Sequence, residues 1–173
     1  MRDGLDLRRQ AVKAGLWLAM SLAAGIGVAP VAAAESQSGV RATLASTPGV
    51  DGPMPPVLAE VSLSSQTMSV YLDAKLSYTF SVSTGRAGYT TPTGSWQAQW
   101  LSPRHRSSKY NNAPMPWSVF FYKGYAVHGT NELDALGQPA SHGCIRLATE
   151  EAKIFFDLVK EYGMPNTLIA VVN

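Results

Sequence analysis

The sequence predicts a mainly β fold: a twisted β-sandwich or partial barrel of short strands with one C-terminal amphipathic helix. From residue 57 onward, short segments that are apolar, or that alternate apolar and polar residues, recur with turn residues between them. This pattern is typical of strands. One segment near the C-terminus has helical periodicity instead. Many short strands with a single packed helix indicate a sandwich or partial barrel.

The first 56 residues are not expected to belong to this domain. A basic start is followed by the apolar run 14–31 and the alanines 32–34. We therefore expect residues 1–34 to be a signal peptide that exports the chain to the periplasm or cell envelope. An uncleaved membrane anchor is the alternative, because the run is just long enough to span a bilayer. Residues 35–56 are rich in Ser, Thr, Gly, Ala and Pro, which predicts a disordered linker before a domain at 57–173.

The strands of this domain are predicted from alternation and from the turns between them. Ser64, Ser65 and Gln66 separate the first two strands as a hairpin turn. Alternate residues of the third strand are expected to share one face: Leu76, Tyr78, Phe80 and Val82. The predicted strands are 57–63, 67–72, 76–84, 94–101, 117–122, 124–127 and 167–172.

Two connections lack the pattern of regular structure, at 86–93 and 102–116. Loops of this length in a compact domain are usually functional lids or disordered. The second loop carries four basic or imidazole side chains and one aromatic ring, at Arg104, His105, Arg106, Lys109 and Tyr110. Such a loop suits an anionic peptide as ligand, and a solvated surface loop is the alternative.

Residues 149–162 are predicted to form the helix. Apolar residues recur there at helical spacing, at Ala152, Phe155, Phe156, Val159 and Tyr162. Thr149 is the predicted N-cap, and the glutamates at 150 and 151 suit the first turn. Gly163 is predicted to end the helix.

Cys144 is the only cysteine in the chain and is the candidate nucleophile. Exported proteins usually carry paired cysteines, so an unpaired thiol suggests reactivity; a buried inert cysteine is the alternative. His128, at the end of a predicted strand, is the candidate general base, unless it is only a core histidine. The Gly129 carbonyl is placed to accept the other ring N–H. The N–H groups of Gly143 and Cys144 are candidate oxyanion donors.

Two neighbouring residues admit more than one role. Arg146 suits a substrate carboxylate bound through two hydrogen bonds, or an ion pair with Glu150 or Glu151. His142 is a second candidate base or a structural group that holds the loop. We favour the structural role, since adjacency along a tight loop rarely aims a ring at the thiol.

Neither nucleic acid nor a metal is expected as a partner. The chain has 14 Lys and Arg against 12 Asp and Glu, and ten of each remain without residues 1–34. A near-neutral protein lacks the basic surface typical of nucleic-acid binding. A zinc site built from His128, His142 and Cys144 would lack a fourth ligand and the usual short spacing. We therefore predict no metal and no cofactor.

The sequence resembles the L,D-transpeptidase catalytic domain family. The resemblance rests on His128-Gly129-Thr130 and on Ser141-His142-Gly143-Cys144-Ile145-Arg146-Leu147. Ser83-Thr84-Gly85 and Thr91-Pro92-Thr93-Gly94 also resemble that family, as does the order of strands, lid, motif and helix. The similarity covers about residues 57–173, although some members have Asn where this chain has Arg146.

The resemblance implies a mainly β enzyme that uses no metal, with Cys144 as nucleophile and His128 as proton acceptor and donor. In that family the cysteine attacks the bond between the L-centre of a diamino acid and the following D-alanine of a peptidoglycan stem. D-Alanine leaves, and an amine resolves the thioester into a cross-link. Stem peptides are thus the expected partners, and carbapenem β-lactams the expected covalent inhibitors. By the same resemblance, the residues expected to shape the pocket and hold the substrate are Ser141, His142, Gly143 and Arg146. Tyr110 is a further candidate for substrate binding, from the composition of the 102–116 loop rather than from the resemblance.

Two other functions stay open from the sequence. If water replaces the amine, the same site is an L,D-carboxypeptidase that trims tetrapeptides. The other alternative is a wall-binding module that has lost the chemistry, although a pure binder has no reason to retain both the Cys144 thiol and His128.

Overall fold

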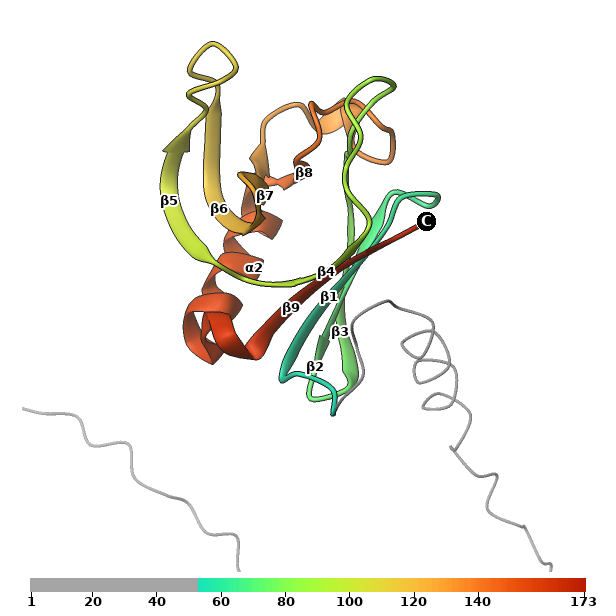
Figure 1. Ribbon diagram of the computed structural model, residues 1–173, viewed down its shortest axis with the longest axis vertical. Coiled ribbons are helices and arrows are strands. Elements are labelled where there is room, and N and C mark those ends of the chain that lie inside the picture. The colour runs from blue at the N-terminus through green and yellow to red at the C-terminus, as the bar shows by residue number, and fades with distance from the viewer. Residues whose placement is uncertain (1–52) are drawn as a thin grey trace, which may run out of the picture. The chain divides into compact units, whose positions relative to one another are not determined.

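The computed structural model describes residues 53–173. The predicted signal peptide and all of the predicted linker except residues 53–56 lie outside the described residues. The described chain forms two β-sheets and one α-helix (Figure 1), so the prediction of a mainly β fold with one C-terminal helix is confirmed. Within this range no helix is long and apolar enough to cross a membrane.

The first sheet has five strands in the order β3-β2-β1-β9-β4. These are β1 (Val57–Ser62), β2 (Thr67–Leu72), β3 (Lys75–Ser81), β4 (Gly94–Gln97) and β9 (Thr167–Val172). β1 and β2 form the predicted hairpin, and β9 pairs with β1 in parallel. The prediction that Leu76 lies on the same face of the third strand as Tyr78, Phe80 and Val82 is wrong. A bulge between Val70 and Tyr71 pairs Leu76 with Tyr71, which faces away from the main core, so Leu76 is 51% exposed.

The second sheet has four strands in the order β5-β6-β7-β8. These are β5 (Trp100–Arg106), β6 (Pro114–Tyr122), β7 (Tyr125–Thr130) and β8 (Ile145–Ala148). The prediction of one strand over 94–101 is wrong, because the chain passes from one sheet to the other there. The Ala98 N–H donates to the carbonyl of Thr167 in β9 at 3.1 Å, and the next N–H, of Gln99, donates to the carbonyl of Phe120 in β6 at 2.7 Å.

The 102–116 segment, predicted as an irregular loop, lies mostly in the hairpin of β5 and β6 (Figure 1). At its tip the Ala113 N–H donates to the Tyr110 carbonyl at 2.9 Å. The two residues between them, Asn111 and Asn112, have φ angles of 46° and 54°. A type I′ turn requires two such left-handed residues, and Asn adopts this conformation more readily than most. The Asn-Asn pair is the sequence signal for this hairpin.

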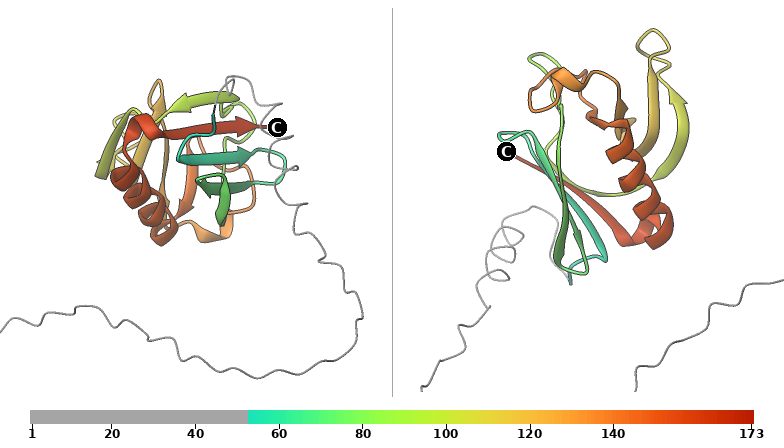
Figure 2. Two further views of the ribbon diagram at one scale, coloured as in Figure 1. Left: turned by 90° about the horizontal axis from the view of Figure 1, so that it is seen from below. Right: turned by 180° about the vertical axis from the view of Figure 1, so that it is seen from behind.

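The helix α2 (Thr149–Tyr162) packs against β6, β7 and β8 (Figure 2). Its start differs from the prediction: Thr149 is the first helical residue and makes no capping hydrogen bond to the helix. The Thr149 hydroxyl instead donates to the Thr130 carbonyl at 3.2 Å, which joins the start of the helix to the end of β7. Gly163 follows the helix as predicted, with a φ of 90°.

One main core joins both sheets and the helix. It contains Val61 and Met68 from the first sheet, Val119 and Ile145 from the second, and Phe155 from α2, each fully buried. The two sheets do not close into a barrel. Beyond the end of β3, isolated bridges join Ser83 to Arg146 of β8 and Gly85 to Ser141. The fold is therefore a sandwich with one helix on its second sheet.

Candidate active site

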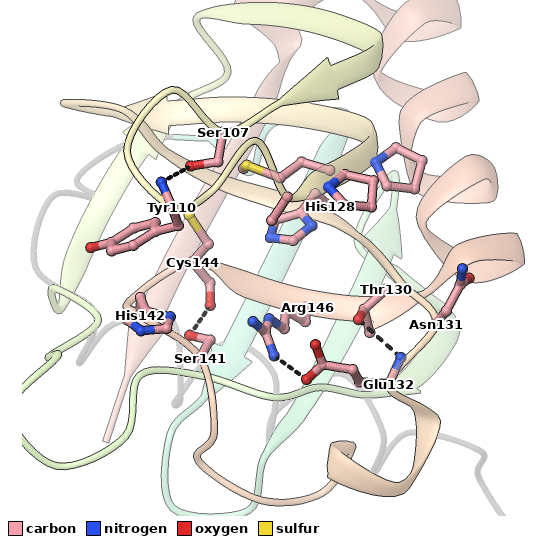
Figure 3. Close-up of a pocket in the computed structure, with 14 residues that line it drawn as sticks. Ser107, Tyr110, His128, Thr130, Asn131, Glu132, Ser141, His142, Cys144 and Arg146 are labelled. Atoms are coloured by element: carbon pink, nitrogen blue, oxygen red, sulfur yellow. Dashed lines mark hydrogen bonds and ion pairs between the residues drawn. The ribbon is translucent and has the colours of Figure 1, made fainter.

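A cavity of about 190 Å³ lies between the tip of the β5–β6 hairpin and the outer face of the second sheet (Figure 3). Three parts of the chain line it: the hairpin, the end of β7 with the turn after it, and the segment from Ser141 into β8. The lining residues are Ser107, Tyr110, Ala113, Pro114, Met115, Pro116, His128, Thr130, Asn131, Glu132, Ser141, His142, Cys144 and Arg146. The structure thus brings six residues singled out in the sequence to one cavity: Tyr110, His128, Ser141, His142, Cys144 and Arg146.

The parallel pairing of β7 and β8 explains why these side chains meet. Val127 lies opposite Ile145, and both are buried in the main core. The next pair in register is His128 opposite Arg146, and because side chains alternate along a strand, this pair faces the other side of the sheet. Cys144 directly precedes β8 and packs on that same side against Met115, Phe120 and Ala126.

The His128 ring is held in one tautomer. Its Nδ1 lies 2.8 Å from the Gly129 carbonyl oxygen, and since a carbonyl only accepts, Nδ1 carries the proton and Nε2 keeps a free lone pair. The side chain is 5% exposed. Burial lowers the pKa of His128 to about 4, with smaller lowering by Arg146 and His105, while the Gly129 hydrogen bond opposes this shift. The ring is therefore neutral at physiological pH.

The Cys144 thiol is also favoured in its neutral form. Burial raises its pKa above the ordinary value, although the backbone of Ala126 and the charge of Arg146 lower it in part. The sulfur and the His128 ring are directed into the same cavity (Figure 3). No hydrogen bond joins them in the described chain, so the pair rests as thiol and imidazole. A nucleophilic attack by this sulfur would therefore require transfer of the thiol proton.

Ser141 shapes the loop that carries the cysteine. Its side chain is fully buried, and its hydroxyl donates to the Cys144 carbonyl at 2.6 Å and accepts the Gly143 N–H at 2.9 Å. The Gly143 N–H, expected from the sequence as an oxyanion donor, is thus engaged by the Ser141 hydroxyl in this structure. The Ser141 N–H in turn donates to the carbonyl of Thr84 at 2.9 Å, which fixes the loop to the segment after β3.

Close contacts favour glycine at both Gly129 and Gly143. Gly143 has a φ of 110°, and a Cβ there would lie 2.7 Å from a ring carbon of Tyr125. At Gly129 a Cβ would lie 3.0 Å from the Thr149 Cα and 3.1 Å from the Pro116 ring. Gly129 thus lets the start of α2 approach the strand whose carbonyl holds the His128 ring.

His142 lies at the rim of the cavity between two tyrosines. Tyr110 of the hairpin stacks on it with ring centroids 4.4 Å apart, and Tyr89 meets it edge-on at 4.5 Å. Arg86 donates to the His142 Nε2 at 2.8 Å. Since a guanidinium only donates, Nε2 accepts and the ring is neutral in this arrangement. Partial burial and then the charges of Arg86 and Arg146 lower the pKa of His142, which agrees with that state.

Arg146 pairs with Glu132 at 2.9 Å. It does not pair with Glu150 or Glu151, the partners considered from the sequence, because α2 lies against the opposite face of the sheet. Glu132 follows β7 and its side chain is 68% exposed. Only one guanidinium nitrogen is engaged in this ion pair, so the group retains donors toward the cavity.

Sequence reasoning assigned no role to three residues that shape this site: Arg86, Thr91 and Glu132. Thr91 donates to the Gly143 carbonyl across 52 positions of sequence, and Arg86 contacts His142 across 56. The segments that flank Arg86 and contain Thr91 carry the family resemblance, which was the one available signal. Among residues 53–173 no group of three or more His, Cys, Asp or Glu is placed to hold a metal ion.

Comparison with known proteins identifies the family. The sequence profile of the L,D-transpeptidase catalytic domain matches residues 56–171. The chain belongs to this family. A probable L,D-transpeptidase of Escherichia coli (strain K12), YbiS, is 31% identical over 93 residues, which cover 50% of this chain and 30% of the relative. A putative L,D-transpeptidase of Bacillus subtilis (strain 168), YkuD, is 25% identical over 139 residues, 76% of this chain and 81% of the relative.

The fold of the family is shared as well. A crystal structure of an L,D-transpeptidase from Mycobacterium tuberculosis H37Rv superposes with a TM-score of 0.62 at 26% identity, over 69% of this chain and 58% of that chain. The fold predicted from the sequence and the family resemblance are thus both confirmed. This chain spans less than two thirds of the length of the E. coli relative and of the M. tuberculosis protein.

Acid should destabilise the domain through His128. Its folded-state pKa of about 4 lies below the ordinary value of 6.5, so the unfolded chain binds the proton first and stability is lost as the pH falls from 6.5 toward 4. One such group costs about 2 kcal/mol at pH 5. We expect the free energy of unfolding in urea to fall between pH 7.5 and pH 5 by about 2 kcal/mol more in the wild type than in His128→Gln. Equal losses in the two proteins would show that the imidazole is not held neutral.

Cys144 should react as a thiol at neutral pH. Because burial raises its pKa and neutral His128 supplies no positive charge, alkylation by iodoacetamide should be slow at pH 7. Its rate should rise about tenfold for each pH unit up to 9, following the thiolate fraction. Intact-protein mass spectrometry measures this directly, since the chain has one cysteine. A rate that stays constant between pH 5 and 8 would instead indicate a thiolate–imidazolium pair.

Proposed function

We propose that this protein is a peptidoglycan L,D-transpeptidase that forms cross-links by acyl transfer through Cys144. One observation carries the proposal: in a chain of this family, the sole cysteine and a neutral histidine with a fixed tautomer line one cavity. A buried, neutral imidazole with a free Nε2 is the state that a general base needs before attack. The cavity also gives a carbonyl substrate a place beside both groups.

In the first half-reaction the Cys144 sulfur attacks the carbonyl carbon of the diamino acid at position three of the stem. The thiol proton passes to the His128 Nε2, a carbon–sulfur bond forms, and the carbonyl oxygen becomes an oxyanion. Collapse of this intermediate breaks the bond to D-alanine, and the imidazolium gives its proton to the leaving amine. Because the pKa of His128 is low, the imidazolium is a strong acid toward that amine.

In the second half-reaction an amine of another stem attacks the thioester. His128 takes a proton from the amine, and the departing sulfur is reprotonated, so the enzyme returns to its thiol and imidazole state. The same two residues thus serve both steps with their roles reversed. His128 needs no change of tautomer, since Nδ1 stays bonded to the Gly129 carbonyl throughout.

The substrate is proposed to bind with its carboxylate toward Arg146 and its chain past the rim formed by Tyr110 and His142. A cavity of about 190 Å³ is below the usual size of a site for a drug-sized ligand. It therefore suits the reacting residues of the stem, with the remainder lying over the rim. Ser141 acts on the loop conformation, since its hydroxyl is fully engaged there.

We also propose export to the cell envelope, since the polymer on which this reaction acts lies outside the cytoplasm. The support is the composition of residues 1–34, a basic start, an apolar run and an alanine triplet.

The products formed from tetrapeptide muropeptides test transfer against hydrolysis. We expect the purified protein to convert disaccharide tetrapeptides into cross-linked dimers with release of D-alanine, resolved by liquid chromatography and mass spectrometry. Cys144→Ala should give neither product. Tripeptide monomers without dimers would mean an L,D-carboxypeptidase, and unchanged tetrapeptides would favour a wall-binding module.

Carbapenems should acylate Cys144 by the same first step. One solved L,D-transpeptidase of this fold is in complex with imipenem, and at 23% identity that likeness shows the fold alone. We expect intact-protein mass spectrometry to show one imipenem adduct on the wild type and none on Cys144→Ser. His128→Ala should acylate about 10² to 10⁴ times more slowly, the usual contribution of a general base. A wild-type mass that stays unmodified after long exposure would contradict the proposed nucleophile.

A further inference from the structure

The hydroxyl of Thr91 is buried beneath the loop that carries the cysteine. The residue is 2% exposed. Its hydroxyl accepts the Gly85 N–H at 2.9 Å and donates to the Gly143 carbonyl at 2.8 Å. Because the Gly85 N–H can only donate, it leaves the hydroxyl proton of Thr91 for the Gly143 carbonyl. The direction of both hydrogen bonds is therefore fixed.

This contact sets the orientation of the peptide group that joins Gly143 to Cys144. In a planar trans peptide the C=O and the following N–H point in opposite directions. With the Gly143 carbonyl held toward Thr91, the Cys144 N–H points away from Thr91. No hydrogen bond from this N–H occurs among residues 53–173. The Gly143 N–H, by contrast, is occupied by the Ser141 hydroxyl.

The backbone on both sides of this hydrogen bond is closely surrounded. A Cβ at Gly143 would lie 2.7 Å from the Tyr125 ring on one side and 3.4 Å from the Thr90 carbonyl oxygen on another. The segment that carries Thr91 is equally tight, since a Cβ at Gly85 would lie 1.7 Å from the Tyr89 carbonyl oxygen. Thr91 thus lies in a closely packed segment, held by hydrogen bonds to Gly85 and Gly143.

We propose that Thr91 is a positioning residue for acyl transfer, whose hydroxyl holds the Gly143–Cys144 peptide so that the Cys144 N–H is free for the oxyanion. This inference rests on the proposed function, because it concerns the same thiol. As the carbon–sulfur bond forms, the π electrons of the substrate carbonyl move onto its oxygen. An N–H group held in place beforehand stabilises that charge without reorganisation. Thr91 acts only through the peptide and contacts neither the thiol nor the substrate.

Two reagents separate this role from a general structural one. Acylation of Cys144 by 4-nitrophenyl acetate passes through an oxyanion: sulfur bonds to the acetyl carbon and nitrophenolate leaves. Alkylation by iodoacetamide displaces iodide from a methylene carbon and forms no oxyanion. Because the chain has one cysteine, both rates can be followed on the same sulfur by intact-protein mass spectrometry, with Cys144→Ser as the blank.

In Thr91→Val, which keeps the shape but loses the hydroxyl, we expect acylation to slow about tenfold or more, while alkylation stays within about twofold of wild type. Thr91→Ser should restore acylation, since it keeps the hydroxyl. Thr93→Val is the matched control, because Thr93 is exposed two positions away in the same motif. Equal slowing of both reactions, or no slowing of either, would overturn the proposal.

A second measurement does not depend on the folding of a variant. A crystal structure of the acetylated wild type should show the thioester oxygen on the Cys144 N–H, with the Gly143 carbonyl still bonded to Thr91. An acyl oxygen bound by the Gly143 N–H, with Ser141 displaced, would overturn the proposal. Neither reagent resembles a stem peptide, so inactivity toward tetrapeptides would refute the proposed function while these two results still decide the role of Thr91.

Discussion

The parallel register between β7 and β8 is the constraint on which the rest of the site depends. It sets Val127 opposite Ile145 in the core and His128 opposite Arg146 on the outer face. A slip of one residue would send the imidazole into the core and an aliphatic side chain into the cavity. Burial of each large aliphatic side chain contributes about 1.5–3 kcal/mol, so the packing that folds the domain also aims the histidine. The same strand end receives the start of α2, because Gly129 leaves room for Thr149.

The neutrality of the thiol and imidazole follows from where this register places them. Burial lowers the pKa of His128 and raises that of Cys144, so an ion pair is disfavoured at rest. In the proposed reaction, charge appears only when a carbonyl is attacked, and it then appears on the substrate oxygen as well as on the imidazole. Stabilising that oxygen therefore matters more here than in a site with a preformed thiolate. This is why the orientation of one backbone N–H, at Cys144, has a large share in the proposed chemistry.

Local patterns are enough to predict β1, β2, β9 and α2, because their apolar residues alternate or recur on one face. Local patterns fail where pairing with a distant strand determines the structure. Ala98 and Gln99 are an example, because their successive N–H groups bond to different sheets. The residues of the candidate site fall into the same two groups, those predictable from local sequence and those placed by tertiary contacts. Cys144, His128 and the Gly129 carbonyl are adjacent in short motifs and can be found by residue type. Thr91 and Glu132 reach the site through tertiary contacts, and the loss of the Gly143 N–H to Ser141 depends on a loop conformation that composition does not encode.

A resting thiol also suits an exported protein with an unpaired cysteine. The thiolate is the form that attacks disulfides and peroxide oxidants, so a raised pKa slows both reactions. Under the proposed export, Cys144 would meet an oxidising compartment without a second cysteine to protect it. In the proposed mechanism the His128 ring reconciles protection with reactivity, because it would remove the thiol proton only as a carbonyl accepts the sulfur. Under this proposal, reactivity depends on a carbonyl substrate that fills the cavity, and a small oxidant, which forms no oxyanion, is not activated by the Cys144 N–H.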